Sequence, residues 1–182
     1  MESLPRTIPS NDWITLVLVG CLLLITIAKY AYERKFYDFA ALLVNDKLYA
    51  KNSKDFKFDN PFNLMLFIVQ LLSISLFFYL IVRALDVAPR VDEVYIYVRI
   101  LVFYCIFVGG KFLTERILGL LFNAEEVLRR YHYSKLLYRN YLAIIILPVN
   151  ALLVYFLAAD LGTLYILLGV FVVLNGISLY VA

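Results

Sequence analysis

Six polar or ionisable residues lie within or at the edges of long apolar runs of this 182-residue chain, and these residues could do chemistry. Charged groups are costly in an apolar environment, so they mark substrate or ion pathways unless anchoring or packing explains them. No acidic residue stands at the centre of an apolar run to partner a cation, which argues against a proton or cation relay. The six candidates are Gln70, Arg99, Lys111, Glu115, Asn150 and Asn175.

Three of these candidates fall in or just after one apolar run. Arg99 lies five residues into the run, about 7–8 Å along a helix axis, so its side chain can snorkel to the nearby headgroups. Lys111 and Glu115 are one helical turn apart, the spacing that favours an ion pair. Arg99 and Lys111 point roughly 120° apart around a helix, so they need not line one path. Interface anchoring and a transport site both remain open.

Pro148 and Asn150 lie in the middle of another apolar run. A proline inside a helix frees the carbonyl four residues back, here that of Ile144. The Asn150 amide could rebind this carbonyl or bridge to another helix. The pair therefore predicts a kink, used either for packing or as a functional hinge.

Three glycines recur every seven residues in the last apolar run and suggest a surface for close helix packing. Seven residues return almost to the same helical face, so these glycines form a smooth groove that another helix backbone can approach. The approaching helix could belong to this chain or to another subunit, and Asn175 lies beside the groove. A glycine pair at 109–110 offers a second close-approach point. The groove residues are Gly162, Gly169 and Gly176.

Sequence motifs for catalysis and for cofactor binding are absent. There is no HExxH, GxSxG, phosphate-binding loop or glycine-rich dinucleotide turn. Cys21 and Cys105 lie in apolar runs, and His132 is the one histidine. This inventory rules out a zinc, iron–sulfur or bis-His haem site within the chain alone. We therefore expect no catalytic residue, no metal and no cofactor.

The composition places these residues in a membrane protein. Hydrophobic residues make up 64% of the chain and charged residues 17%, against about 45–50% and about 25% in ordinary globular domains. A soluble domain of this length could not bury so much apolar surface, so a soluble single-domain enzyme and a disordered chain are both excluded. The net charge of +3 is too small to indicate nucleic-acid binding.

Five apolar stretches are long enough to cross a bilayer, since about 20 helical residues match a hydrocarbon layer of about 30 Å. Their continuous apolar character indicates helices rather than strands. The predicted fold is therefore all-α: a polytopic helical membrane protein that forms a single transmembrane domain. The predicted spans are 13–32, 62–81, 94–113, 141–159 and 161–182.

The distribution of basic residues predicts the orientation of the spans, because cytoplasmic loops are enriched in Lys and Arg. Thirteen of the 17 basic residues lie in or beside two connections, between spans one and two and between spans three and four. We therefore expect a periplasmic N-terminus and two long cytoplasmic loops. The first span has a basic trailing flank and should remain as an anchor rather than be cleaved. The four other basic residues are Arg6, Arg83, Arg90 and Arg99.

Both cytoplasmic loops are expected to be partly helical. In the first, Phe36 and Phe39 share one face of a short amphipathic helix, which we place along the inner leaflet. In the second, Asn123 is a good helix N-cap, and Glu126 stands three residues later at the capping-box position. A helix should begin there and lead to the fourth span.

Three stretches of the sequence are distinctive: NDW at 11–13, FIVQLLSISLFF in the second span, and GKFLTERILGLLFNAEEVLRRY, which leads to YRNYLAIIILPVN. Together they resemble an uncharacterised family of Bacteroidota integral membrane proteins, domain of unknown function 4271 (DUF4271), over nearly the whole chain. The resemblance implies the inner membrane of a Gram-negative bacterium and supplies no activity. Members usually continue with a further hydrophobic segment. Because no basic flank follows the last span, we expect such a segment to be missing after Ala182.

Two of the compatible functions are binding or transport. The first is a non-enzymatic subunit or assembly factor of a cell-envelope complex, with the lipid bilayer and another membrane-protein subunit as partners. The glycine groove and the lack of catalytic residues favour this function. The second is a small transporter or channel, whose polar path would include Gln70, Arg99, Asn150 and Asn175.

The third compatible function is a lipid-modifying enzyme. Such an enzyme would need acidic side chains to hold a metal near the headgroups. We expect them to come from the second cytoplasmic loop and its border, although the capping box alone explains Glu126. The residues concerned are Glu115, Glu125, Glu126 and His132.

Overall fold

The computed structural model describes residues 12–41, 61–85, 92–121, 125–155 and 161–181, and every regular element in these ranges is an α-helix. The all-α fold predicted from the sequence is therefore confirmed for the described chain. The helices are α1 (Asp12–Ala31), α2 (Glu33–Ala41), α4 (Pro61–Ala84), α5 (Glu93–Leu121), α6 (Glu125–Tyr155) and α7 (Leu161–Val181).

Four segments of these helices are long and apolar enough to cross a membrane, so the protein is a helical membrane protein. α7 is a further helix of 21 residues without a charged residue, at the place where the sequence predicts the last span. Five crossings and a periplasmic N-terminus stay predictions from the sequence. The four segments are Asp12–Ala31, Pro61–Ala84, Glu93–Gly119 and Lys135–Tyr155.

The helix boundaries follow from local chemistry. Asp12 in the first turn of α1 places a carboxylate at the positive end of the helix dipole. α4 begins with Pro61, whose missing N–H is no loss in a first turn. α6 is one helix through Pro148, so the helix predicted in the second loop is continuous with the fourth apolar run. Asn123, the expected N-cap, lies outside the described residues.

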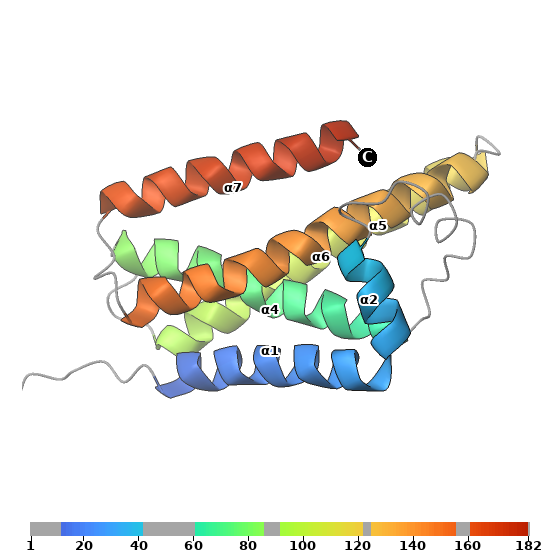
Figure 1. The fold of residues 1–182 in the computed structure, drawn as a ribbon. Helices are drawn as coiled ribbons and strands as arrows, with labels where there is room; N and C mark the ends of the chain where they lie inside the picture. Colours follow the sequence, from blue (N-terminus) through green and yellow to red (C-terminus); the bar gives the residue numbers. More distant parts are fainter. Residues whose placement is uncertain (1–11, 42–60, 86–91, 122–124, 156–160, 182) are drawn as a thin grey trace, which may run out of the picture.

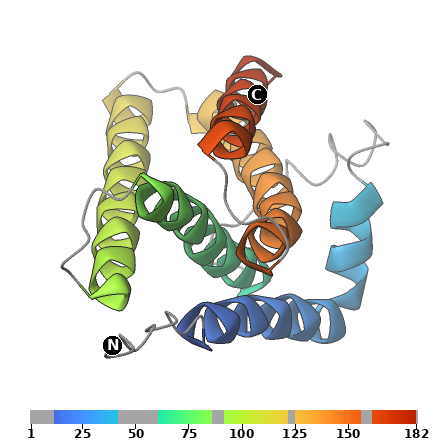
Figure 2. The ribbon, with the colours of Figure 1, turned by 90° about the vertical axis from the view of Figure 1, so that its left-hand side faces the viewer.

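α4 lies at the centre of the bundle and contacts α1, α5 and α6 (Figures 1 and 2). α1 and α7 run along opposite sides of the bundle (Figure 1). In the α4 span 56% of the residues are buried, against 11% in the α5 span. α4 therefore carries the core, and most of α5 is left to face lipid.

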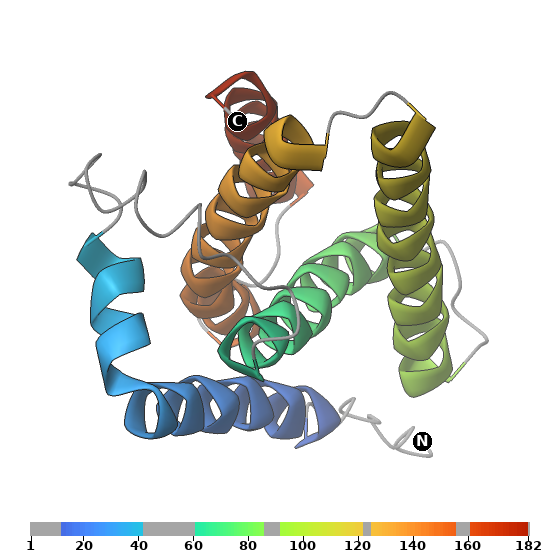
Figure 3. The same cartoon turned by 90° about the vertical axis from the view of Figure 1, so that its right-hand side faces the viewer.

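The bundle has two ends that differ in chemistry. The α2 end holds α2, the last turns of α1 and α5, and the first turns of α4 and α6 (Figures 1 and 3). The opposite end, which we call the Trp13 end, holds the first turns of α1 and α5 and the last turns of α4 and α6. The orientation predicted from the sequence places the α2 end in the cytoplasm.

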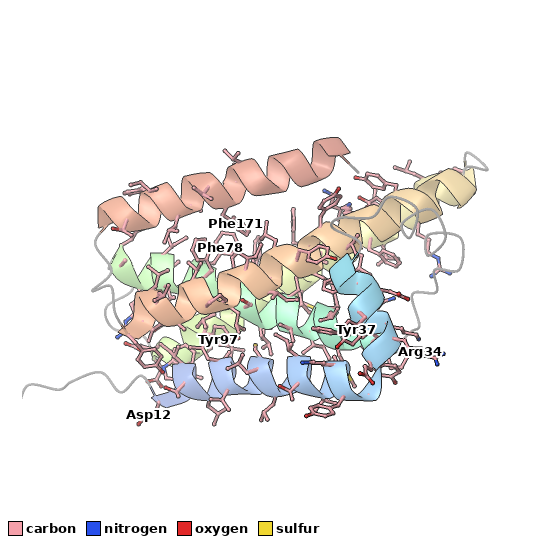
Figure 4. The ribbon with its side chains drawn as sticks, viewed as in Figure 1. Asp12, Arg34, Tyr37, Phe78, Tyr97 and Phe171 are labelled. Carbon is pink, nitrogen blue, oxygen red and sulfur yellow. The ribbon has the colours of Figure 1, made fainter. Side chains whose placement is uncertain are left out.

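Aromatic side chains close the core towards the Trp13 end. The ring of Trp13 lies 5.0 Å from that of Tyr79 and 5.2 Å from that of Tyr97, measured between centroids. Tyr97 is 5% exposed and lies within the bundle (Figure 4). On the other side of α4, Phe78 meets Phe171 edge to face at 5.8 Å and so joins α4 to α7 (Figure 4). Such pairs stabilise helix contacts beyond their buried area.

α2 turns away from α1 and lies across the end of the bundle (Figure 1). Phe39 is 6% exposed and stacks on Tyr141 of α6 at 4.2 Å between ring centroids, and the Tyr141 hydroxyl donates to the Phe39 carbonyl. Arg34 and Tyr37 are exposed on the outside (Figure 4). The expectation that the Phe39 face lies on the inner leaflet is therefore wrong. The rings of α6 and α4 offer this face a closer apolar partner than lipid.

Candidate functional site

Two of the predicted polar candidates, Gln70 and Asn150, are fully buried between α4 and α6. Asn150 Nδ2 donates to the Ser73 carbonyl of α4 at 2.8 Å. Ser73 Oγ donates back to the Ala143 carbonyl of α6 at 3.3 Å. Of the two roles expected for the Asn150 amide, the structure shows the bridge to another helix. Hydrogen bonds of this kind contribute about 0.6–2 kcal/mol each between helices in a membrane.

Gln70 sits one turn nearer the α2 end of α4 and binds the guanidinium of Arg139 on α6. A guanidinium can only donate hydrogen bonds, so the Gln70 amide must present its oxygen to it. In this orientation the oxygen accepts from Arg139 Nη2 at 2.7 Å, from Arg139 Nε at 2.9 Å and from the Tyr104 hydroxyl at 3.2 Å. One buried amide thus ties α4 to both α5 and α6.

Glu115 of α5 forms an ion pair with Lys135 of α6. Their side chains are 18% and 9% exposed, so the pair is largely removed from water. The helical spacing had indicated Lys111 as the partner of Glu115. In the structure Glu115 pairs instead with Lys135, across the α5–α6 interface. The pair therefore holds two helices together instead of stabilising a single turn.

A cavity of about 230 Å³ lies between α5 and α6 at the α2 end, next to this ion pair. Its charged lining comprises Lys111, Glu115, Lys135 and Arg139. Three cations therefore face one acid. The remaining lining consists of glycine and apolar side chains, namely Phe67, Val108, Gly109, Phe112 and Leu136.

From the sequence alone, Lys135 and Arg139 count only as basic residues that set the orientation. Their separation of four residues, one helical turn, was the available signal for a shared face. Only the fold brings that face opposite Lys111 and Glu115, because α5 and α6 flank α4 at this end (Figure 3). The candidate site is therefore larger than the two α5 residues predicted.

Arg99 is not part of this site. It is exposed on α5, whereas Gln70 and Asn150 are fully buried in the α4–α6 interface. The structure therefore does not bring Arg99 together with these two amides along one path. The side chain of Asn175 lies outside the described residues, as do those of Glu125, Glu126 and His132.

The glycines of α7 face away from the bundle. A Cβ atom placed on Gly169 or Gly176 would meet no atom within 4 Å, and Gly162 is exposed as well. α7 instead packs through larger side chains, with Leu167, Leu168 and Phe171 against the core. The predicted groove is therefore not where α7 meets the described helices of this chain. Gly109 and Gly110 of α5 are equally open.

The Trp13 end has its own charged pair. Arg83 Nη2 at the end of α4 lies 3.8 Å from Glu93 Oε1 at the start of α5, and the Tyr79 hydroxyl donates to Glu93 Oε2 at 2.9 Å. Both charged side chains keep about a third of their surface, 29% and 35%. This pair joins the end of α4 to the start of α5 and contains one cation and one acid.

Potential metal ligands do not gather in the part of the chain that the structure describes. Cys21 is buried and Cys105 is exposed, and they form no disulfide. No group of three or more His, Cys, Asp or Glu side chains lies together among the described residues. Among the described residues, the cavity between α5 and α6 is the feature whose charge indicates a kind of ligand, namely an anion.

Fold and site together define an all-helical membrane protein with a basic cavity between two of its helices. The chain belongs to the family described as domain of unknown function (DUF4271), whose model matches residues 14–182. The family resemblance expected from the sequence is therefore confirmed. No curated protein and no solved structure matches the chain.

Proposed function

We propose that this protein is a non-enzymatic subunit or assembly factor of a cell-envelope complex. In this proposal it lies in the inner membrane of a Gram-negative bacterium, with its N-terminus in the periplasm and its basic loops in the cytoplasm. The observation that carries the proposal is the open glycine face of α7.

This face differs from an ordinary lipid-facing surface in shape. Large side chains such as Ile166 and Val173, 69% and 59% exposed, stand three and four residues from Gly169 and border the glycines on the same side of α7. The space around Gly169 and Gly176 is empty within 4 Å of a Cβ position. Association between membrane helices depends on close packing, and small residues let two backbones approach. A helix of another subunit would gain contacts there that lipid chains cannot match.

The test is co-purification from native membranes in a mild detergent, with the mass of the complex measured by native mass spectrometry. We expect a stoichiometric partner with the wild-type chain and its loss in the double variant Gly169→Leu/Gly176→Leu. The matched control is Gly20→Leu on α1, where an added Cβ also meets nothing within 4 Å. A lone monomer in the wild-type preparation would overturn the proposal.

The transporter alternative has less support. Gln70 and Asn150 are engaged in hydrogen bonds between helices, which gives each a packing role. Arg99, the cation expected on the same path, is exposed on α5. The lipid-modifying enzyme would depend on Glu115, which pairs with Lys135, and on three residues whose side chains lie outside the described residues, Glu125, Glu126 and His132. Neither alternative rests on an observation comparable to the open face of α7.

A further inference from the structure

We propose that the cavity between α5 and α6 binds the phosphate of an anionic lipid headgroup. This site is separate from the proposed partner surface on α7 and goes beyond the proposed function. It follows from four properties of the cavity: its charge, its volume, its depth and its opening.

The charge of the cavity favours an anion. Lys111, Lys135 and Arg139 line it with one acid, Glu115, so the lining has a formal charge of +2. The ion pair with Glu115 offsets Lys135 and leaves two cations without an acid in the lining. Gln70 takes two of the five N–H donors of the Arg139 guanidinium, and the others can bind an oxyanion.

The volume fits a headgroup rather than a large organic ligand. About 230 Å³ corresponds to roughly seven or eight water molecules at about 30 Å³ each. Pockets for drug-sized ligands are larger, about 300–1,000 Å³. A tetrahedral phosphate with part of its ester substituent is of the right size for this space.

The depth of the cavity matches the boundary between headgroups and hydrocarbon. Lys135 begins the apolar segment of α6, and Arg139 follows one turn later, about 6 Å along the axis. On α4, Phe67 lies six residues after Pro61, about 9 Å into that helix. Basic pockets between membrane helices at this level are typical sites for anionic lipid headgroups.

The opening of the cavity favours a lipid over a soluble phosphate. Gly109 and Lys111 line the cavity and are exposed on α5, the span with the smallest buried fraction. A Cβ on Gly109 would meet nothing within 4 Å, so the α5 wall is open at this point. A lipid can therefore place its headgroup in the cavity from the side while its acyl chains stay along α5.

The experiment measures lipid binding to the purified full-length chain in neutral detergent. Phosphatidylglycerol, phosphatidylcholine and inorganic phosphate are added separately, and native mass spectrometry and thermal unfolding report binding and stabilisation. We expect one phosphatidylglycerol to be retained, with a higher unfolding temperature. Phosphatidylcholine carries the same phosphate beside a compensating cation and should be retained much less.

Two variants test the site without removing a helix contact described above. Lys111→Gln removes an exposed cation and should weaken phosphatidylglycerol binding about fivefold, the effect of about one cation near a membrane surface. Gly109→Leu should block the opening and abolish the retained lipid. Gly110→Leu is its matched control, because Gly110 is equally open but does not line the cavity.

Glu115→Gln should change the affinity for phosphatidylglycerol in the opposite direction. It removes the one acid of the lining, so phosphatidylglycerol should bind more tightly, by about fivefold. A purely structural role of these residues would not produce a gain in affinity. Equal affinity in the wild type, Lys111→Gln and Gly109→Leu would overturn the proposal. Stabilisation by inorganic phosphate with no effect of either lipid would overturn the lipid source and assign the site to a soluble phosphate.

Discussion

The two ends of the bundle both join α5 to a neighbouring helix through charged residues, but they balance these charges differently. At the Trp13 end, Arg83 pairs with Glu93, and the Tyr79 hydroxyl donates a hydrogen bond to the same carboxylate. At the α2 end, Glu115 and Lys135 form a more buried pair, and two further cations line the adjacent cavity. The first arrangement has one cation and one acid. The second has two cations more than the ion pair between α5 and α6 requires, and a cavity beside them.

This difference distinguishes polar residues that only hold helices together from polar residues that could bind a ligand. Buried polar groups in a membrane bundle usually find partners within it, as Asn150 and Gln70 do here. A cation that lines a cavity can do more than hold helices together, because partial removal of its charge from water is costly without an anion. Charge imbalance and a cavity at one place are thus more informative than the presence of ionisable residues in the spans.

The largest expected effect concerns the packing of α2 on the α2 end. Phe39→Ala removes a ring that is 6% exposed and stacks on Tyr141. We expect a loss of about 3 kcal/mol in the free energy of unfolding, the lower end of the range for buried aromatic residues. The measurement is reversible unfolding in detergent micelles. Tyr37→Ala on the same helix is the control, since that side chain is 63% exposed and should change stability by less than about 0.5 kcal/mol.

The next prediction compares the acids of the two ends directly. Glu115→Gln leaves Lys135 without its counter-charge and should cost about 2 kcal/mol, below the ~3–5 kcal/mol of a fully buried pair because Glu115 is partly exposed. Phosphatidylglycerol should restore part of this loss. Glu93→Gln should cost less than about 1 kcal/mol, since its pair is more exposed.

The effect of phosphatidylglycerol on the stability of the two variants shows whether the two ends differ in lipid binding. Phosphatidylglycerol should not rescue Glu93→Gln, because the Arg83 side chain is 29% exposed and water can solvate its charge when Glu93 is replaced. Equal rescue of both variants would show a general effect of anionic lipid on the bundle. The contrast drawn between the two ends would then be wrong.

Tyr79→Phe tests how far the Trp13 end depends on the hydroxyl of Tyr79. The ring is 1% exposed and would keep its packing on Trp13, while the hydrogen bond to Glu93 would be lost. We expect a loss of about 1 kcal/mol in the free energy of unfolding, the usual net value of a hydrogen bond. If Tyr79→Phe and Glu93→Gln are combined, their effects should not be fully additive, because both change interactions of the same side chain.

The sequence predicted the helical architecture well because long apolar runs leave the backbone few alternatives in a membrane. The helices α4 and α5 contain the second and third predicted spans, α1 contains the first up to Ala31, and α6 contains the fourth up to Tyr155. Local rules also predicted the start of α6 near residue 124, and they gave a bridge to another helix as one of two roles for Asn150. These features depend on hydrophobicity, helix geometry and hydrogen-bond requirements that act over a few residues.

The candidate site was only partly predictable, since it depends on contacts between residues far apart in the chain. Glu115 pairs with Lys135, twenty residues later, and Arg139 binds Gln70 of α4 across the interface. No helical spacing encodes such contacts. The face of Phe39 was assigned to lipid for the same reason, because an amphipathic pattern shows which face is apolar and not what covers it.

The smallest expected effect is that of Arg99→Leu, near the Trp13 end of α5. Arg99 is exposed and can extend along the helix towards the headgroups, so its replacement should change the free energy of unfolding by less than about 0.5 kcal/mol. Phosphatidylglycerol retention should be unchanged, in contrast to Lys111→Gln on the same helix. Growth of a strain that carries Arg99→Leu as its only copy should equal that of the wild type at equal expression. A growth defect or a loss of transport at normal expression would instead place Arg99 on a transport path. The Trp13 end would then hold a functional cation in addition to the Arg83–Glu93 pair.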